Sequence, residues 1–392
     1  MLKRTLTLVF IAIVSLNSCK KDDDTTPEPS NPQIVVPSTY EFTDADGNNT
    51  VNFNGQAQRL EMLEEIASYM KTANTAGISI DAQTLKDMYV NDGITWSDGP
   101  ELGMTGSSKQ LKSKTAAAPS GIADPGIQAS FELYIEQIAT LSASTIDGEN
   151  TGSAGVGGVV VSSTNPSKQY LQSAEGVEYS QVIEKGLMGA VFYNQITQNY
   201  LSESEMSGDN STAIDPDNGK YYTDMEHAWD EAYGYFTTAT DYAPDGNGTD
   251  RFWGKYADGS REELLGSATK ISEAFRNGRA AIVAKDLSLR NGQIAIIRTE
   301  LERMIAGTAI HYLNGAVGDF GDDALRNHQL SEAIAFIGCL PYGFETVATQ
   351  QEVAACFAIL GNNHYDVTIT NINSVRDLIA TEAGLSEYKE IL

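Results

Sequence analysis

The sequence has few basic residues. Its 26 lysines and arginines stand against 53 aspartates and glutamates, which gives a formal net charge of −27. An acidic surface of this kind repels nucleic acid and anionic lipid headgroups, so it argues against either as a partner of the folded protein. Such a surface attracts cations, including metal ions, although solubility alone accounts for most of the charge.

Long hydrophobic runs are also absent. The longest apolar stretch, residues 6–16, is too short for a mature transmembrane helix and follows Lys3 and Arg4, as in a secretory signal peptide. The tetrad Leu-Asn-Ser-Cys at residues 16–19 resembles a lipoprotein signal-peptidase box. That resemblance implies cleavage before Cys19 and acylation of Cys19, and two or more acyl chains anchor a protein stably to a membrane. We therefore expect a membrane-attached lipoprotein.

The residues after Cys19 are acidic and rich in proline. The run KKDDD, residues 20–24, resembles the acidic export tag of Bacteroidota-type surface lipoproteins, which implies an outer-membrane lipoprotein exposed at the cell surface. An ordinary acidic tether is the alternative. The expected organisation is a signal peptide at residues 1–18, a tether at 19–37 and a folded domain at 38–392.

Cysteine is scarce, since the chain has three. With Cys19 acylated, Cys339 and Cys356 remain on either side of a predicted turn between two helices. In an oxidising compartment this pair can form a disulfide. Their apolar neighbours are equally consistent with two buried free thiols, so both alternatives stay open.

Strand signals are few, and apolar residues recur mostly with helical spacing, which predicts an all-α protein of about ten helices. The first helix begins near Asn54, and another begins at Asp124-Pro125, an acidic cap followed by proline. A long helix covers residues 178–201, and Ser260 with Glu263 forms a capping box for a helix toward Leu289. The glycine-rich passage at 147–166 lacks a phosphate-loop ending and is interpreted as a flexible crossover.

Histidine is scarce as well, yet two of the four histidines open similar phrases. HAWDEAYGYF at 227–236 and HQLSEAIAFI at 328–337 share histidine, glutamate, alanine and apolar residues at matching positions. In each case a long helix containing glycine, alanine and tyrosine precedes the phrase. The match suggests an internal duplication, with two related antiparallel helical bundles formed by about residues 38–257 and 258–392.

The spacing of these phrases brings acid and imidazole groups together. On a helix, Glu231 shares a face with His227 and Asp230 flanks it, while Glu332 repeats the spacing after His328. One imidazole and one carboxylate a turn apart can bind a metal ion such as iron or zinc. His311 is a candidate for a further nitrogen ligand. Candidates for further carboxylates are Glu178, Glu184 and Glu300, and nothing in the sequence assigns them.

A purely structural interpretation stands beside the metal site. Trp229, Tyr235, Phe236, Phe336 and Ile337 are typical core residues, so each His–Glu pair can be a hydrogen-bonded contact on a packed helix. No zinc-protease or serine-hydrolase motif is present, and peptidase activity therefore gains no support from these residues.

The lipoprotein signal, the duplicated helical body and the stretch MEHAWDEAYGYF together resemble the imelysin-like superfamily. The resemblance is to its uncharacterised surface-lipoprotein branch, a domain-of-unknown-function family, over about residues 40–390. It implies two four-helix bundles and a Gly-any-His-any-any-Glu motif that is associated with metal and iron uptake. The motif histidine falls on His227 and its carboxylate on Asp230. Met225 replaces the motif glycine, and Glu231 is a competing carboxylate.

Two functions follow as expectations. The first is a surface-anchored protein that binds a metal ion and assists iron uptake. The alternative is a non-catalytic lipoprotein that binds a glycan or peptide or acts as a scaffold, for which Trp96 and Trp253 near loops would suit carbohydrate stacking. The sequence leaves the oligomeric state open.

Overall fold

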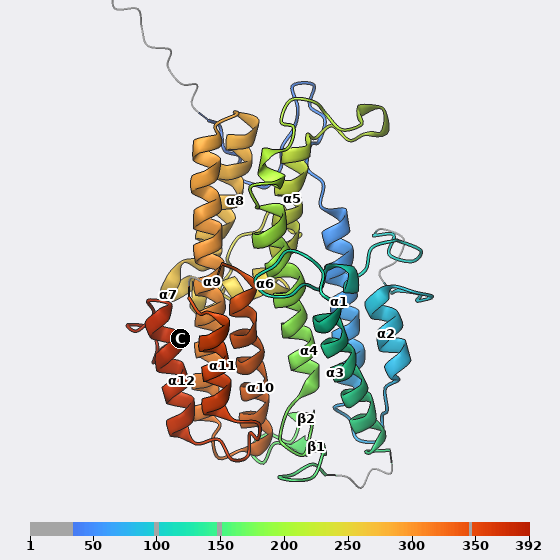
Figure 1. The fold of residues 1–392 in the computed structure, drawn as a ribbon, viewed down its shortest axis with the longest axis vertical. Coiled ribbons are helices and arrows are strands. Elements are labelled where there is room, and N and C mark those ends of the chain that lie inside the picture. Colours follow the sequence, from blue (N-terminus) through green and yellow to red (C-terminus); the bar gives the residue numbers. More distant parts are fainter. Residues whose placement is uncertain (1–33, 98–101, 147–150, 345–346) are drawn as a thin grey trace, which may run out of the picture. The chain divides into compact units, whose positions relative to one another are not determined.

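The computed structural model describes residues 34–97, 102–146, 151–344 and 347–392, and residues 35–392 form one compact unit (Figure 1). The predicted signal peptide at residues 1–18 lies outside the described residues, as do Cys19 and most of the tether. The described chain is mainly helical, so the coarse prediction of an all-α protein is confirmed. Within the described ranges, none of the helices combines the length and apolar composition needed to cross a membrane.

The described elements are as follows. The α-helices are α1 Asn54–Thr72, α2 Ala82–Val90, α3 Pro125–Ala143, α4 Tyr179–Leu187, α5 Asp224–Phe236, α6 Phe252–Ala257, α7 Ser260–Leu265, α8 Ser267–Val283, α9 Leu287–Gly318, α10 Asp323–Cys339, α11 Gln350–Leu360 and α12 Ile369–Glu382. Two π-helical stretches are η2 Met188–Tyr193 and η3 Gln195–Tyr200, and the strands are β1 Gly158–Val161 and β2 Gln169–Gln172. Single 3-10 turns occupy Lys112–Lys114, Glu205–Ser207, Pro216–Asn218 and Leu340–Tyr342.

Side-chain caps set several helix starts. The Asp124 carboxylate accepts the backbone N–H of Ile127 ahead of Pro125, so the predicted start of α3 is confirmed, as is the start of α1 at Asn54. The predicted capping box at Ser260 is wrong. Ser260 is already inside α7, and this helix ends after one and a half turns because Gly266 adopts a left-handed conformation with φ of 66°. A separate helix, α8, then begins at Ser267.

Two other predictions need correction in detail. The long helix expected at 178–201 begins as α4 but continues as the π-helices η2 and η3, which lie in the protein interior. The glycine-rich passage at 147–166 is not simply a crossover. It contains β1, which pairs antiparallel with β2 in a register that runs from Gly158↔Gln172 to Val161↔Gln169. Backbone hydrogen bonding along the run Gly-Val-Val-Val therefore outweighs the flexibility of the neighbouring glycines.

The long helix α9 organises the packing. Short turns connect it to α8 before it and to α10 after it, so its first half lies against α8 and its second half against α10. In addition, α10 packs on α4, and α5 packs on η3, α1 and α8 (Figure 1). Helices on both sides of the predicted boundary at residues 257 and 258 are thus in direct contact.

The core is rich in aromatic rings. Trp229, Tyr235, Phe236, Phe336 and Ile337 are fully buried, as the structural interpretation of the two phrases requires. Trp96 and Trp253 are also buried, so the expectation that these rings are exposed for carbohydrate stacking is wrong. Both are drawn inward because an indole ring gains more from burial than from a place on a loop surface.

Both remaining cysteines are buried as free thiols. Cys339 lies against Gly189, and its Sγ donates to the carbonyl oxygen of Lys185 at 3.3 Å. Of the two alternatives for Cys339 and Cys356, the structure has the free thiols.

One close helix contact explains a glycine in α8. A β-carbon on Gly278 would lie 2.1 Å from the ring of Trp229, whose Nε1–H donates to the carbonyl oxygen of Phe275 at 3.0 Å. Both contacts come from α8, and the backbone of this helix approaches the indole closely only because residue 278 has no side chain.

We predict that Gly278→Ala lowers the free energy of unfolding by about 1–3 kcal/mol, because the added methyl group forces the Trp229 ring or α8 to move. Gly292→Ala in α9 is the matched control, since a β-carbon there meets no atom within 4 Å. It should leave stability unchanged or raise it by up to about 1 kcal/mol. Denaturant unfolding measures both, and equal midpoints for the Gly278 variant and the wild type would contradict the packing described.

Candidate functional site

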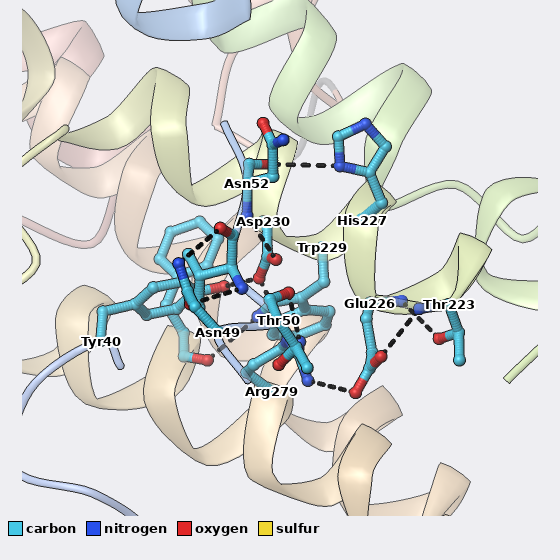
Figure 2. Close-up of polar contacts among 12 residues, drawn as sticks. Tyr40, Asn49, Thr50, Asn52, Thr223, Glu226, His227, Trp229, Asp230 and Arg279 are labelled. Carbon is cyan, nitrogen blue, oxygen red and sulfur yellow. Dashed lines mark hydrogen bonds and ion pairs between the residues drawn. The ribbon is translucent and has the colours of Figure 1, made fainter. Parts of the chain in front are cut away.

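Helix α5 carries most of the predicted site residues, and its start is fixed by a capping box. The Thr223 hydroxyl accepts the backbone N–H of Glu226, and the Glu226 carboxylate accepts the backbone N–H of Thr223 (Figure 2). From this start, residue 230 falls on the buried face and residues 227 and 231 fall on a partly exposed face. Asp230 and Glu231 therefore point into different environments although they are adjacent.

Asp230 is completely buried and fully engaged. Its Oδ1 accepts from Arg279 Nε at 3.0 Å and from the Tyr40 hydroxyl at 2.9 Å, and its Oδ2 accepts the backbone N–H of Asn52 at 3.2 Å (Figure 2). These three donors come from α8 and from the segment that precedes α1. The carboxylate of α5 is thus the point at which three parts of the chain meet.

Arg279 is equally buried and has used its donors. Its Nη1 donates to Glu226 at 2.7 Å, and its Nη2 donates to the carbonyl oxygen and the hydroxyl of Thr50 at 3.1 and 3.0 Å (Figure 2). The guanidinium also lies over the Phe42 ring, 5.0 Å from its centroid. The cation that compensates Asp230 in this structure is therefore an arginine side chain.

The electrostatics follow from burial. Burial raises the pKa of Asp230 to about 6, although the Arg279 charge and the Tyr40 hydroxyl act in the opposite direction. Burial lowers the pKa of Arg279, but the Asp230 and Glu226 carboxylates outweigh it and the net shift is upward. Both groups are therefore ionised at neutral pH, and the pair is a buried salt bridge.

His227 and Glu231 face a different direction. The Nδ1–H of His227 donates to the carbonyl oxygen of Asn52 at 3.1 Å, and its ring stacks on Tyr222 with 4.6 Å between centroids. A carbonyl can only accept, so in the neutral ring Nε2 carries the free lone pair. This nitrogen lies 4.0 Å from Glu231 Oε2, while Glu231 Oε1 accepts from Gln56 Nε2 at 2.9 Å.

The second phrase forms a similar arrangement on α10. The ring of His328 stacks on Tyr170 of β2 with 4.2 Å between centroids. Its Nδ1 lies 2.7 Å from Glu178 Oε2 and its Nε2 lies 3.6 Å from Glu332 Oε1. The carboxylates contact opposite nitrogens of the ring, so they hold the imidazole between them and do not converge on a common point.

One cation near this second pair is Lys185, whose charge opposes protonation of His328. Lys185 lies 2.7 Å from Glu184 Oε1, and Lys71 lies 2.6 Å from Glu184 Oε2. Burial lowers the pKa of His328, but Glu178 and then Glu332 raise it, and the net shift is upward. The imidazole therefore holds its proton more strongly than an ordinary histidine does.

The structure keeps the predicted metal ligands in separate places. His227 and Glu231 are together, His328 and Glu332 are together, and His311 lies on α9 with its ring edge-on to Tyr312. Asp230, one position from Glu231, faces Arg279 instead. Within the described ranges, no group of three or more histidine, cysteine, aspartate or glutamate side chains is arranged to hold a metal ion.

A cleft of about 770 Å³ lies beside this network, and sequence reasoning missed it. Its walls come from residues 40–57, from Thr238 and Thr240 after α5, and from Arg251. Tyr40 and Asn52 belong both to the cleft wall and to the contacts of Asp230. The sequence signal that could have indicated it is the recurrence of asparagine and aromatic residues from Tyr40 to Asn54.

Several polar groups in the cleft are unused. In the part of the chain that the structure describes, the side chains of Thr43, Asn54, Thr238 and Thr240 form no hydrogen bond. Arg251 at the same cleft pairs with Glu61 and Glu64 at 2.6 and 2.8 Å. The cleft thus offers hydroxyl and amide groups next to the ring of Phe53.

Comparison with known proteins gives one match. Residues 37–386 match the model of a family described as Domain of unknown function (DUF4856). No curated protein and no solved structure matches the chain.

We predict that Asp230→Asn lowers the free energy of unfolding by about 3–5 kcal/mol, because it leaves the Arg279 charge incompletely compensated in the interior. A double variant, Asp230→Leu with Arg279→Met, should recover most of this loss. The control is Asp377→Asn, at a half-exposed ion pair on α12, which should change stability by no more than about 1 kcal/mol. Urea unfolding of the wild type and the three variants measures these free energies. A loss of unfolding free energy in Asp230→Asn as small as that in the control would contradict a buried ion pair between Asp230 and Arg279.

We predict that His328 stabilises the fold in a pH-dependent way. Its pKa is raised in the folded state, so its contribution is complete below about pH 6.5 and is lost as the pH rises through the folded pKa. The difference in unfolding free energy between wild type and His328→Gln should therefore shrink between about pH 5.5 and about pH 8.5.

His364 is the matched control for this experiment. Burial lowers its pKa to about 4, so the unfolded chain takes up a proton at a pH where the folded chain does not. The difference between wild type and His364→Gln should therefore grow, not shrink, as the pH rises toward about 6.5. Unfolding curves across the pH range measure both, and parallel trends for the two histidines would contradict the assigned environments.

Proposed function

The chain belongs to the family Domain of unknown function (DUF4856), and from its geometry we propose that it is a non-catalytic binding protein that captures short glycans. The observation that carries the proposal is the cleft beside α5, with its unused hydroxyl and amide groups and a volume of about 770 Å³. That volume lies in the range of ordinary small-molecule sites. Unused donors and acceptors on a cleft wall suit a ligand that brings many hydroxyl groups.

The chemistry of the wall favours a carbohydrate. Sugar rings present hydroxyl groups at their edges and C–H groups on their faces, so they need hydrogen-bonding side chains beside an aromatic surface. Thr238, Thr240 and Asn54 supply the former, and the half-buried ring of Phe53 supplies the latter. Arg251, held by two glutamates, adds a planar group with fixed donors.

The cleft wall is preorganised. The backbone N–H of Tyr40 donates to the carbonyl oxygen of Thr240, and the Tyr40 ring stacks on Tyr233 with 3.6 Å between centroids. Hydrogen bonds to the Asp230–Arg279 pair hold Tyr40, Thr50 and Asn52 in place. A rigid wall lowers the entropic cost of binding, since little side-chain or loop order has to be gained with the ligand.

The proposal includes the location. The predicted signal peptide, the predicted acylation of Cys19 and the predicted acidic tether support an outer-membrane lipoprotein exposed at the cell surface. A surface position gives such a cleft access to extracellular glycans.

Metal binding is the second candidate, and one observation favours it. His227 Nε2 and Glu231 Oε2 are 4.0 Å apart, partly exposed, and Nε2 makes no other contact in the described structure. A single iron or zinc ion could join these two ligands to water. His328 with Glu332 repeats the pair at 3.6 Å. We propose this function together with membership of the imelysin-like superfamily and an internal duplication. The protein would then assist iron uptake.

We predict that the wild type binds short glycans on an array and that chelator does not change the binding. Thr240→Val, which removes one unused hydroxyl from the cleft at constant volume, should weaken the binding of the best glycan about 3- to 15-fold. Thr370→Val makes the same change on the exposed side of α12 and should bind like the wild type. Isothermal titration calorimetry gives the three affinities.

The opposite outcomes are equally definite. An array without any bound glycan, or equal affinities for Thr240→Val and the wild type, would refute the glycan proposal. Metal analysis of protein purified without a histidine tag tests the second candidate. Bound iron or zinc that is lost in His227→Ala would support it, and a metal content that is the same in both proteins would refute it.

A further inference from the structure

Two arginines of α9 have no ion-paired carboxylate in the part of the chain that the structure describes. Arg290 is 6% exposed and Arg298 is half-buried, and both side chains face the segment from Leu201 to Ser207. Among the described residues, neither guanidinium has a carboxylate within ion-pair distance. This is unexpected in a chain with a net charge of −27, in which acidic groups outnumber basic groups two to one.

Other arginines of the chain show the contrast. Several buried or half-buried guanidinium groups lie beside carboxylates, and these pairs are Arg251 with Glu61, Arg279 with Asp230, Arg326 with Asp323 and Arg376 with Glu390. Arg59 and Arg261 likewise donate to backbone carbonyls and have no ion-paired carboxylate in the described structure. What distinguishes Arg290 and Arg298 is that both line the same cavity.

Backbone carbonyls hold both arginines in position. Arg298 Nη2 donates to the carbonyl oxygen of Leu201 at 2.6 Å, and Arg290 Nη1 donates to that of Met206 at 2.6 Å. The side-chain oxygen of Asn291 also accepts from Arg290 Nε and Nη2, at 3.1 and 2.7 Å. The ring of Phe344 covers one face of Arg298, with 4.0 Å from Cζ to the centroid. Carbonyl dipoles and an aromatic ring orient a guanidinium, but they do not cancel its charge. Burial accordingly lowers the pKa of both arginines.

A cavity of about 370 Å³ lies between these arginines and the segment opposite. Ser202, Ser207 and Asn291 contribute polar side chains to its wall, and Ile294 contributes an apolar one. Glu203 is at the same cavity but is exposed to solvent. The volume exceeds that of a single inorganic ion and leaves room for an organic group beside the anionic one.

We propose that this cavity, here called the arginine cavity, binds a small organic anion that carries a carboxylate, phosphate or sulfate group. The guanidinium of Arg298, whose Nε has no hydrogen-bond partner among the described residues, matches the oxygen atoms of such groups in geometry, and a bound anion would supply the missing countercharge. The apolar wall at Ile294 would receive the carbon part of the ligand. The site is separate from the glycan cleft in its residues, so it does not rest on the proposed function.

The first experiment compares anions on the full chain. Isothermal titration calorimetry at constant ionic strength measures glucuronate, glucose 6-phosphate and inorganic phosphate, with sodium chloride as the reference. We expect saturable binding of at least one organic anion, tighter than that of inorganic phosphate. A response no greater than that of chloride for every anion would overturn the proposal, and phosphate as the tightest ligand would overturn its organic part.

The second experiment removes one charge. Arg298→Gln should weaken binding of the best anion about 10- to 100-fold, because it removes a charge-assisted hydrogen bond. Arg303→Gln, which removes an arginine that is paired with Glu300 on the same helix, should bind like the wild type. Equal affinities for Arg298→Gln and the wild type would overturn the proposal.

A third variant keeps the test decisive if Arg298→Gln does not fold. Glu203 is exposed at the cavity and its carboxylate forms no ion pair in the described structure, so Glu203→Gln should leave the fold intact. It removes a negative charge near the bound anion and should tighten binding about two- to threefold. An unchanged or weaker affinity in this variant would refute binding of an anion at this place.

Discussion

The buried ion pair between Asp230 and Arg279 ties together parts of the chain that are far apart in sequence. Asp230 comes from α5, Arg279 from α8, and Tyr40, Thr50 and Asn52 from the segment ahead of α1. Two desolvated charges are stable in an interior only when each has its partner and its remaining hydrogen bonds, and here the neighbouring groups provide them. The extended segment is thereby fixed against two helices, and the cleft that it lines has a defined shape.

The histidines at 227 and 328 have the same local geometry but different hydrogen-bonding partners. In both, the imidazole stacks on a tyrosine and its Nε2 faces the glutamate one turn later. On α5 the other ring nitrogen meets a backbone carbonyl, whereas on α10 it meets the buried carboxylate of Glu178. Glu178 and Glu332 favour the protonated form of His328 and raise its pKa. The same helix pattern therefore places one imidazole beside a neutral acceptor and the other between two acids.

Much of the helical framework could be predicted, because helix periodicity and caps such as Asp124-Pro125 are local properties. The failures are tertiary. Gly266 splits a predicted helix, and Trp96 and Trp253 turn inward, for reasons that only packing supplies. For the site, spacing alone put His227 beside Glu231 and His328 beside Glu332. It could not show that Arg279 would meet Asp230 or that Glu178 would meet His328, because those contacts join residues 49 and 150 positions apart. The cleft at Tyr40 to Asn54 arises from an irregular segment, which has no period to detect.

The length of α9 has a mechanical consequence. One continuous helix of 32 residues contributes to the packing of α8 at one end and of α10 and α12 at the other. A helix that is hydrogen-bonded throughout behaves as a stiff rod over this distance, about 48 Å. The helices gathered around its two ends cannot hinge against each other without breaking that rod. The candidate cleft therefore belongs to a helical body that resists bending between these two groups of helices.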